Sequence, residues 1–411
     1  MRRYIKYLVA IAIALTAVAT VVSCEKDPMG NPDKDPRSAL ERYWADDYVG
    51  KLGIQVQNTD IKGTKQPRMF IGGKILYVTG INCYNLFNQS FGGGKFNLEK
   101  VRNTVEVFEK EQVPIVRFAC CPYYANEFHY YMDKKTEYLA TLDSLATYCD
   151  RAHVALIPSF YWNISAAPDY YGESHKAWGD TSSKTYAFMQ QYTTDIVNTL
   201  KGHKCLAAWE FGNEFNLQAD IPHNFTISAK DEEVALKGFA ETVKAADPEG
   251  RMISSGNSIM RNAQYHMMME KSWTNDTFDE YKQITKIFTP DPMNGISEHI
   301  YEDKRVFSDV NNGSELSRTD QMSYAKQVAA SLGKVYYVGE FTGPKTANGD
   351  SLMIRKHLIA YYAQRVQVSL MWNYAYKADI EYSFKHDTPY GNMAFNMMRE
   401  YNERFKTVSE Q

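Results

Sequence analysis

Residues 114–161 decide the fold: PIVRFA at 114–119, the stretch 136–151, and VALIPSFY at 154–161. The two short apolar runs predict buried strands, and the segment between them has the apolar period of an amphipathic helix. A strand, a helix and a second strand in this order are typical of parallel strands that a helix connects and covers.

The same alternation continues in both directions. Eight strands are predicted, at Leu76–Asn82, Pro114–Ala119, Val154–Tyr161, Leu206–Phe211, Met252–Gly256, Gly295–His299, Lys334–Glu340 and Val368–Asn373. Helices are predicted at Leu98–Glu111, Thr136–Arg151, Lys184–Leu200, Glu232–Ala246, Thr319–Leu332 and Ser351–Gln367. Eight such units without a dinucleotide-binding fingerprint favour an α/β fold of the closed (β/α)8 TIM-barrel type, a single domain with long loops after the strands. Ahead of the barrel, Gly72 and Gly73 predict a hairpin turn that could plug the barrel floor.

The composition indicates a globular protein. Of 411 residues, 44% are hydrophobic and 23% are charged, and the net charge is −3. A nucleic-acid-binding protein would usually carry a strong basic excess, so that class is disfavoured. The 30 tyrosines outnumber the 20 phenylalanines, which favours aromatic rings at wet surfaces.

The N-terminus resembles a bacterial lipoprotein signal. Arg2, Arg3 and Lys6 precede an apolar run that is short for a spanning helix and ends in VVSC at 21–24. We therefore expect a signal peptide over 1–23, a polar tether over 24–45 behind a lipidated Cys24, and one domain over 46–411. The expected product is a monomeric outer-membrane lipoprotein that faces the periplasm or the cell surface. A plain secretory signal is the alternative.

Five further cysteines follow Cys24, without a CxxC or zinc-ligand spacing. A disulfide framework is not expected, although one bridge from Cys83 to Cys120 or Cys121 stays open. HExxH, HxH and GxSxG patterns are absent from the sequence, which disfavours metalloprotease and nucleophile-elbow chemistry.

Polar residues gather where the predicted strands end, which is where (β/α)8 barrels build active sites. These residues are Arg117, Asn213, Glu214, His299, Tyr301, Glu340 and Trp372. Two carboxyl groups that face each other suit glycosidic cleavage, because one protonates the leaving oxygen while the other attacks C1 or activates water. The charge of Glu340 is expected to raise the pKa of Glu214. Glu210 is expected to make a buried contact inside the barrel, and Glu298 to face the helices.

WEFGNE at 209–214, His299-x-Tyr301, VGEF at 338–341 and Trp372 resemble glycoside hydrolase family 5, the cellulase and mannanase family, from about Met69 to the C-terminus. The resemblance implies that Glu214 is the acid/base and Glu340 the nucleophile of a retaining mechanism. It implies binding or orienting roles for the others: Asn213 for the sugar 2-hydroxyl, Arg117 and Tyr301 for Glu340, His299 for the acid/base side or the substrate, and Trp372 as a platform under the −1 sugar.

Two departures bear on the substrate. IPSFYWN at 157–163 lacks the histidine that many cellulases of the family carry there, and Phe215 replaces the usual proline. The first departure resembles the mannanase branch, with Trp162 as a candidate subsite wall. The expected partner is a β-linked polysaccharide or oligosaccharide, cut by an endo-β-mannanase-like reaction without cofactor or metal. A cellulase-type β-1,4-glucanase, a transglycosylase and a non-catalytic glycan-binding lipoprotein remain alternatives.

Overall fold

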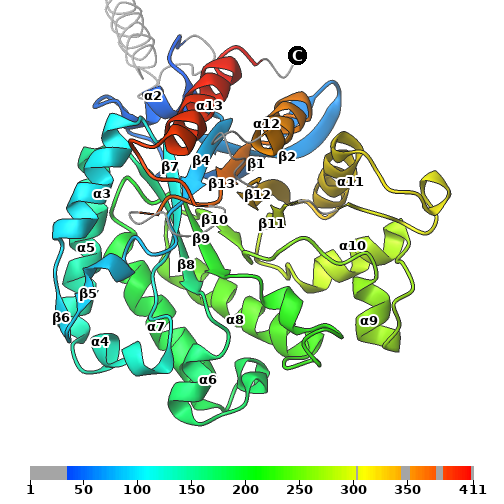
Figure 1. Cartoon of the computed structure of the whole chain (residues 1–411), viewed down its shortest axis with the longest axis horizontal. Coiled ribbons are helices and arrows are strands. Elements are labelled where there is room, and N and C mark those ends of the chain that lie inside the picture. Colours follow the sequence, from blue (N-terminus) through cyan, green and yellow to red (C-terminus); the bar gives the residue numbers. More distant parts are fainter. Residues whose placement is uncertain (1–34, 302–303, 344–351, 376–382, 409–411) are drawn as a thin grey trace, which may run out of the picture.

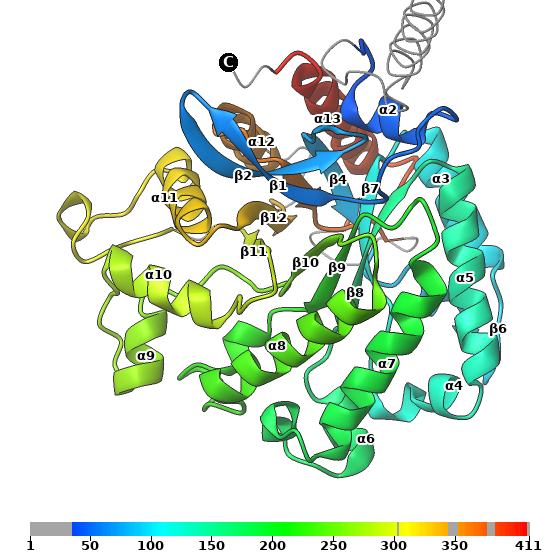
Figure 2. The same cartoon turned by 180° about the vertical axis from the view of Figure 1, so that it is seen from behind.

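The computed structural model describes residues 35–301, 304–343, 352–375 and 383–408. Eight parallel strands form a closed barrel at the centre of the molecule (Figures 1 and 2). They are β4 (Val78–Asn82), β7 (Ile115–Ala119), β8 (Ala155–Tyr161), β9 (Ala208–Gly212), β10 (Met252–Ser254), β11 (Gly295–Ile300), β12 (Val335–Phe341) and β13 (Val368–Met371). β13 pairs with β4 and closes the ring. The predicted (β/α)8 barrel is confirmed, and each predicted strand overlaps an observed one.

Six helices match the predicted ones: α3 (Glu99–Lys110), α5 (Lys135–Arg151), α7 (Lys184–Leu200), α8 (Ala229–Ala246), α11 (Arg318–Ser331) and α12 (Leu352–Ala363). Shorter helices lie before or within the loops: α2 (Ala39–Trp44), α4 (His129–Met132), α6 (Ala166–Tyr171) and α9 (Gln264–Glu270). The sequence analysis missed α10 (Phe278–Ile287) and α13 (Pro389–Phe405). Both begin at a capping threonine, Thr277 and Thr388, which is an ordinary helix-start signal.

The N-terminal end of the barrel is closed by apolar packing. β2 (Thr64–Ile71) pairs with β1 (Gln55–Ile61) and, through the predicted turn at Gly72 and Gly73, with β3 (Lys74–Ile75). Both turn glycines have positive φ, which glycine adopts without strain. A second apolar cluster, the floor cluster, joins these segments to the lowest barrel layer; its members include Met69, Ile71, Leu76, Ile157, Tyr337 and Leu370. The predicted floor plug is confirmed.

The tether predicted over 24–45 is wrong at its C-terminal end. Ser38 caps α2 in a reciprocal capping box with Glu41, and Tyr43 of this helix is fully buried in the floor cluster. The Tyr43 hydroxyl also accepts a hydrogen bond from Gly53 N at 2.9 Å. This helix is therefore part of the packed domain, and Lys74 Nζ also donates to the Arg37 carbonyl ahead of it. Cys24 and the predicted signal peptide lie outside the described residues.

Two further strands, β5 (Phe91–Gly92) and β6 (Lys95–Phe96), form a small hairpin in the first barrel loop. Within the described ranges, the chain has no helix with the length and apolarity that crossing a membrane requires. The cysteines within these ranges are all buried and unbridged: Cys83, Cys120, Cys121, Cys149 and Cys205. The bridge left open by the sequence is therefore not formed.

Candidate active site

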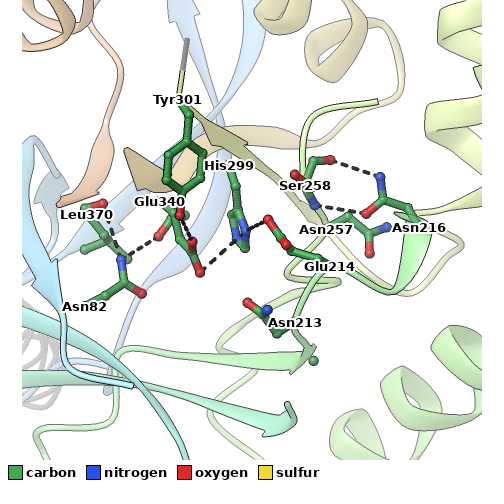
Figure 3. A network of polar contacts seen from close by, with 12 residues as sticks. Asn82, Asn213, Glu214, Asn216, Asn257, Ser258, His299, Tyr301, Glu340 and Leu370 are labelled. Carbon is green, nitrogen blue, oxygen red and sulfur yellow. Dashed lines mark hydrogen bonds and ion pairs between the residues drawn. The ribbon is translucent and has the colours of Figure 1, made fainter. Parts of the chain in front are cut away.

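Glu340 lies at the C-terminal end of β12, almost fully buried. Its Oε1 accepts a hydrogen bond from Arg117 Nη1 at 2.6 Å. Its Oε2 accepts one from the Tyr301 hydroxyl at 2.7 Å (Figure 3). Burial raises the pKa of Glu340, while the charges of His299 and Arg117 oppose that rise. Both carboxylate oxygens are thus held by donors, one from the end of the adjacent β11 and one from β7 across the barrel.

Arg117, on β7, is the centre of a buried polar network. Its Nε donates to Glu210 Oε1 at 2.6 Å, and its Nη2 donates to Asn213 Oδ1 at 3.0 Å. The Tyr337 hydroxyl donates to the second Glu210 oxygen at 2.6 Å. Burial lowers the pKa of Arg117, but the two carboxylates outweigh it and raise that pKa. Glu210 is therefore the deep polar contact that its strand position predicts.

His299, at the end of β11, lies between the two candidate carboxylates (Figure 3). Its Nδ1 is 2.9 Å from Glu214 Oε1 and 3.5 Å from Glu340 Oε1. Its buried Nε2 finds no hydrogen-bond partner among the described residues. An N–H buried without an acceptor is costly, whereas a proton on Nδ1 faces both carboxylates. A Cβ at Gly339 would lie 2.9 Å from Nε2, so this ring requires a glycine beside it.

Glu298, the neighbour of His299, points the other way. Its carboxylate accepts from the Tyr281 hydroxyl at 2.7 Å and from the Tyr336 hydroxyl at 3.0 Å. Tyr281 belongs to α10, so Glu298 faces the helix layer as the strand alternation predicts.

Glu214 follows β9 in a left-handed backbone conformation, with φ of 57°. Its N–H donates to Gly256 O at 3.0 Å, and its side chain is 28% exposed. Sparsely populated backbone conformations persist where packing over-determines them, often at functional sites. Here the β10 end holds the backbone and leaves the carboxyl at the mouth of the barrel.

The expected rise in the pKa of Glu214 is wrong for the free protein. Burial raises this pKa, but the hydrogen bond and charge of His299, the Ser258 hydroxyl and Arg117 together bring it below its ordinary value. The repulsion between the carboxyls acts instead on Glu340, where Glu214 adds to the rise. The contact between the His299 N–H and Glu214 depends on the folded structure and could not be predicted from the sequence.

One donor or acceptor atom from each of Glu214, His299 and Glu340 lies within 4.8 Å of the others. The same spacing occurs in two other groups of the described residues, Asp150–His203–Cys205 and His266–Asp276–Glu280. Such groups could hold a metal ion. In each group, however, the histidine is hydrogen-bonded to a carboxylate, so the residues satisfy one another without an ion.

Aromatic rings cover the network. Trp162, after β8, lies with its ring 4.7 Å from the Arg117 guanidinium carbon. Trp372, after β13, lies nearly parallel to Trp162 and to Tyr84, with ring centroids 6.0 and 5.6 Å apart. These three rings are partly exposed and form an apolar wall beside the carboxylates.

All eight residues predicted for the site lie at the C-terminal ends of barrel strands. Contacts connect six of them: Arg117, Asn213, Glu214, His299, Tyr301 and Glu340. Trp162 adjoins that group through Arg117, and Trp372 adjoins it through Trp162. The structure adds Asn82, whose Oδ1 accepts from Arg117 at 3.1 Å, and Ser258. Asn82 ends a predicted strand, so the same criterion could have found it; the short β10 gave no such signal for Ser258.

No protein-family model matches the chain, and no curated protein matches it. Solved structures do. The endo-1,4-β-mannanase of Rhizomucor miehei has a TM-score of 0.60 at 12% identity, over 85% of this chain and 99% of that one. A glycoside hydrolase family 5 mannosidase of the same organism has a TM-score of 0.60 at 10% identity, over 86% of this chain and 99% of that one. The β-mannanase of the mussel Mytilus edulis has a TM-score of 0.56 at 14% identity, over 88% of this chain and 99% of that one. At these identities the likeness shows the fold alone, the (β/α)8 barrel.

Proposed function

We propose that the chain is a retaining β-glycoside hydrolase of the family 5 type, acting first on β-mannan or its oligosaccharides. One observation carries the proposal: an oxygen of Glu214 and an oxygen of Glu340 lie within 4.8 Å of each other at the barrel mouth. Retaining glycosidases hold their two carboxyl groups about 5–5.5 Å apart, whereas inverting enzymes need about 6.5–9.5 Å to admit a water. The spacing favours the two-step reaction.

In the first step Glu340 attacks the anomeric carbon and forms a glycosyl ester. The bond from that carbon to the leaving oxygen breaks, and the leaving oxygen takes its proton from Glu214. Arg117 and Tyr301 fix both Glu340 oxygens in place before the attack. Preorganised donors of this kind need no rearrangement as charge shifts in the transition state.

In the second step Glu214, now a carboxylate, takes a proton from water, and the water oxygen replaces Glu340 at the anomeric carbon. Two displacements return the sugar to its original configuration. Esterification removes the negative charge of Glu340. Glu214 is then the only carboxylate that accepts the hydrogen bond from the His299 N–H. That hydrogen bond favours the ionised acid/base that this step requires.

Substrate binding favours the protonated form of Glu214 that the first step needs, with the proton taken from solvent. The Glu214 side chain is 28% exposed in the free protein, and a sugar chain in the mouth would exclude water from it. Loss of water favours the neutral form of a carboxyl group and raises its pKa. The substrate thereby shifts Glu214 toward the protonated state.

The mannan assignment is supported by two features. The compared structures are named as mannanases and a mannosidase, and β8 is followed by Trp162 at the position where the sequence lacks a histidine. The wall of Tyr84, Trp162 and Trp372 offers ring faces for the axial C–H groups of a sugar chain. A β-1,4-glucan is the second substrate to test, because ring faces alone do not select a hexose.

A panel of purified polysaccharides, assayed for new reducing ends, tests this proposal. We expect β-mannan to give the highest rate. Glu214→Ala should lose most activity and regain it with azide on an activated aryl β-mannoside. Glu233→Gln, a change at a partly exposed position on α8, should match wild type. Binding of polysaccharide without release of reducing ends would instead identify a glycan-binding protein. Release of sugar only when a sugar acceptor is present would identify a transglycosylase.

We also propose that the chain is lipidated at Cys24 and anchored in a bacterial outer membrane. The basic start, the apolar run and VVSC at 21–24 support this. Cells that express the chain with a labelled fatty acid should yield labelled protein in the membrane fraction. Cys24→Ser should abolish the label, and unlabelled, freely released wild-type protein would contradict the anchor.

A further inference from the structure

A fully buried asparagine lies just behind Glu214 and cannot touch a substrate. Asn216 belongs to the 3-10 helix Phe215–Gln218, whose N-cap is Glu214, and it has no exposed surface. Its Oδ1 accepts a hydrogen bond from Ser258 N at 3.0 Å, and its Nδ2 donates to Ser258 O at 3.2 Å (Figure 3). Because a backbone donor and a backbone acceptor face the two ends of the amide, its orientation is fixed.

The segment that Asn216 binds has left the barrel sheet. β10 pairs with its neighbouring strands only as far as Ser254. Gly256 follows with a φ of 71°, which lets the chain turn away from the strand direction. Ser258 is buried, so its backbone N–H and C=O need partners within the protein. The side chain of Asn216 provides a partner for each of them.

The same segment holds the backbone of Glu214. Gly256 O accepts a hydrogen bond from Glu214 N at 3.0 Å, and Ser258 lies only two residues further along. Glu214 has a left-handed φ of 57°, and such a conformation persists where the surrounding contacts over-determine it. The two hydrogen bonds of Asn216 therefore fix the segment that in turn fixes Glu214.

We infer that Asn216 is a positioning residue for the acid/base: it holds the end of β10 in place, and through it the backbone of Glu214. The catalytic side of this role rests on the proposed hydrolase function, whereas the hold on the Glu214 backbone does not.

Loss of Asn216 should impair proton transfer more than nucleophilic attack. Glu340 is held by Arg117 and Tyr301, which come from β7 and the end of β11 rather than from β10. A misplaced Glu214, by contrast, protonates the leaving oxygen poorly, and a displacement of about 1 Å can cost about 100-fold in rate. An acidic phenol departs without a proton, so the loss should depend on the leaving group.

Two aryl β-mannosides measure this dependence. Asn216→Leu keeps the side-chain size and removes both hydrogen bonds. We expect its kcat/KM to fall about tenfold to a hundredfold with a phenyl leaving group, and to stay within about threefold of wild type with a dinitrophenyl group. Equal loss on both substrates, or none on either, would overturn the positioning role. If the leucine variant does not fold, Asn216→Ala, which leaves room for a water to reach Ser258, gives the same comparison.

Asn402 on α13 provides a matched control toward the floor of the barrel. Its Oδ1 accepts from Thr79 N at 2.7 Å, and its Nδ2 donates to Thr79 O at 2.9 Å. Asn402→Leu therefore removes the same pair of hydrogen bonds, here from β4, and should lower Tm as Asn216→Leu does. It should keep kcat/KM near wild type with both leaving groups. A loss that depends on the leaving group in this control would show general destabilisation and overturn the role of Asn216.

Hydrogen–deuterium exchange, read by mass spectrometry of overlapping peptides, tests the hold on Glu214 without an activity assay. Asn216→Leu should speed exchange of the Glu214 N–H about tenfold or more, because opening of the β10 end releases it from Gly256 O. Asn402→Leu should speed exchange at Thr79 and leave Glu214 unchanged. An unchanged Glu214 amide in Asn216→Leu would contradict the inference. If wild type cleaves no glycan, the proposed function fails, while the exchange still decides whether Asn216 holds Glu214.

Discussion

The two ends of the barrel solve different problems with the same strands. At the floor, apolar barrel side chains such as Ile157, Tyr337 and Leu370 pack with Met69 and Ile71 of β2 into one cluster. At the mouth, barrel strands end in a buried arginine, three carboxyl groups and a histidine whose Nε2 has no hydrogen-bond partner among the described residues. The floor therefore contributes stability, whereas the buried charges at the mouth cost stability and serve the proposed reaction. Substitutions at the two ends should separate activity from stability.

The largest effect is expected at the mouth from Glu340→Gln. The amide cannot form the glycosyl ester, so kcat should fall by roughly 10⁴-fold, a barrier increase of about 5 kcal/mol. Tm should stay close to that of wild type, because shape and most contacts remain. Steady-state kinetics checks the loss of kcat, and thermal unfolding of the same preparation checks the unchanged Tm. A variant that retains substantial activity would exclude Glu340 as nucleophile.

Arg117→Met should impair both activity and stability. Glu210 and Glu340 would each lose a 2.6 Å contact with the guanidinium. Removing one partner from a buried ion pair costs about 3–5 kcal/mol, because the remaining charge is left uncompensated. Urea unfolding should show this loss, and kcat should fall in the folded fraction. Addition of Glu210→Gln should recover part of the stability but none of the activity. If the two changes in unfolding free energy simply add, the shared network would be excluded.

Met69→Ala tests the floor. The side chain is fully buried in the floor cluster, so its truncation should cost about 2–5 kcal/mol of unfolding free energy. Met69→Leu conserves volume and should cost less than about 1.5 kcal/mol. Both variants should keep the wild-type kcat at a temperature where they are folded. A fall in kcat that follows the loss of stability would show that the two ends are coupled.

The barrel strands and the residues at their C-terminal ends could be predicted from the sequence. Eight strands follow from short apolar runs, and one rule, polar residues where parallel strands end, placed Arg117, Glu214 and Glu340 together. Tertiary contacts were beyond that rule. The pKa of Glu214 depends on which atom the His299 N–H faces, and the role of Ser258 depends on a bend after a three-residue strand. Gly256, where a Cβ would lie 1.9 Å from Gly212 O, marks that bend only once the strands are packed.

The smallest effect expected is a shift in pH dependence. His299 lowers the pKa of Glu214 in the free protein, and the basic limb of kcat/KM reports the free acid. His299→Ala should therefore raise that pKa and move the basic limb to higher pH. Tyr301→Phe removes a hydrogen bond that lowers the pKa of Glu340, so it should move the acidic limb upward instead. A basic limb unchanged in His299→Ala would assign it to another group.

Trapping of the glycosyl ester tests the central claim most directly. Wild type would be incubated with a 2-deoxy-2-fluoro-β-mannosyl fluoride, digested, and examined by mass spectrometry. The two-step reaction predicts one added fluorosugar on the peptide that contains Glu340, and none in Glu340→Gln. An active enzyme that forms no adduct and releases product of inverted configuration, or an adduct on another residue, would contradict the assignment of Glu214 and Glu340.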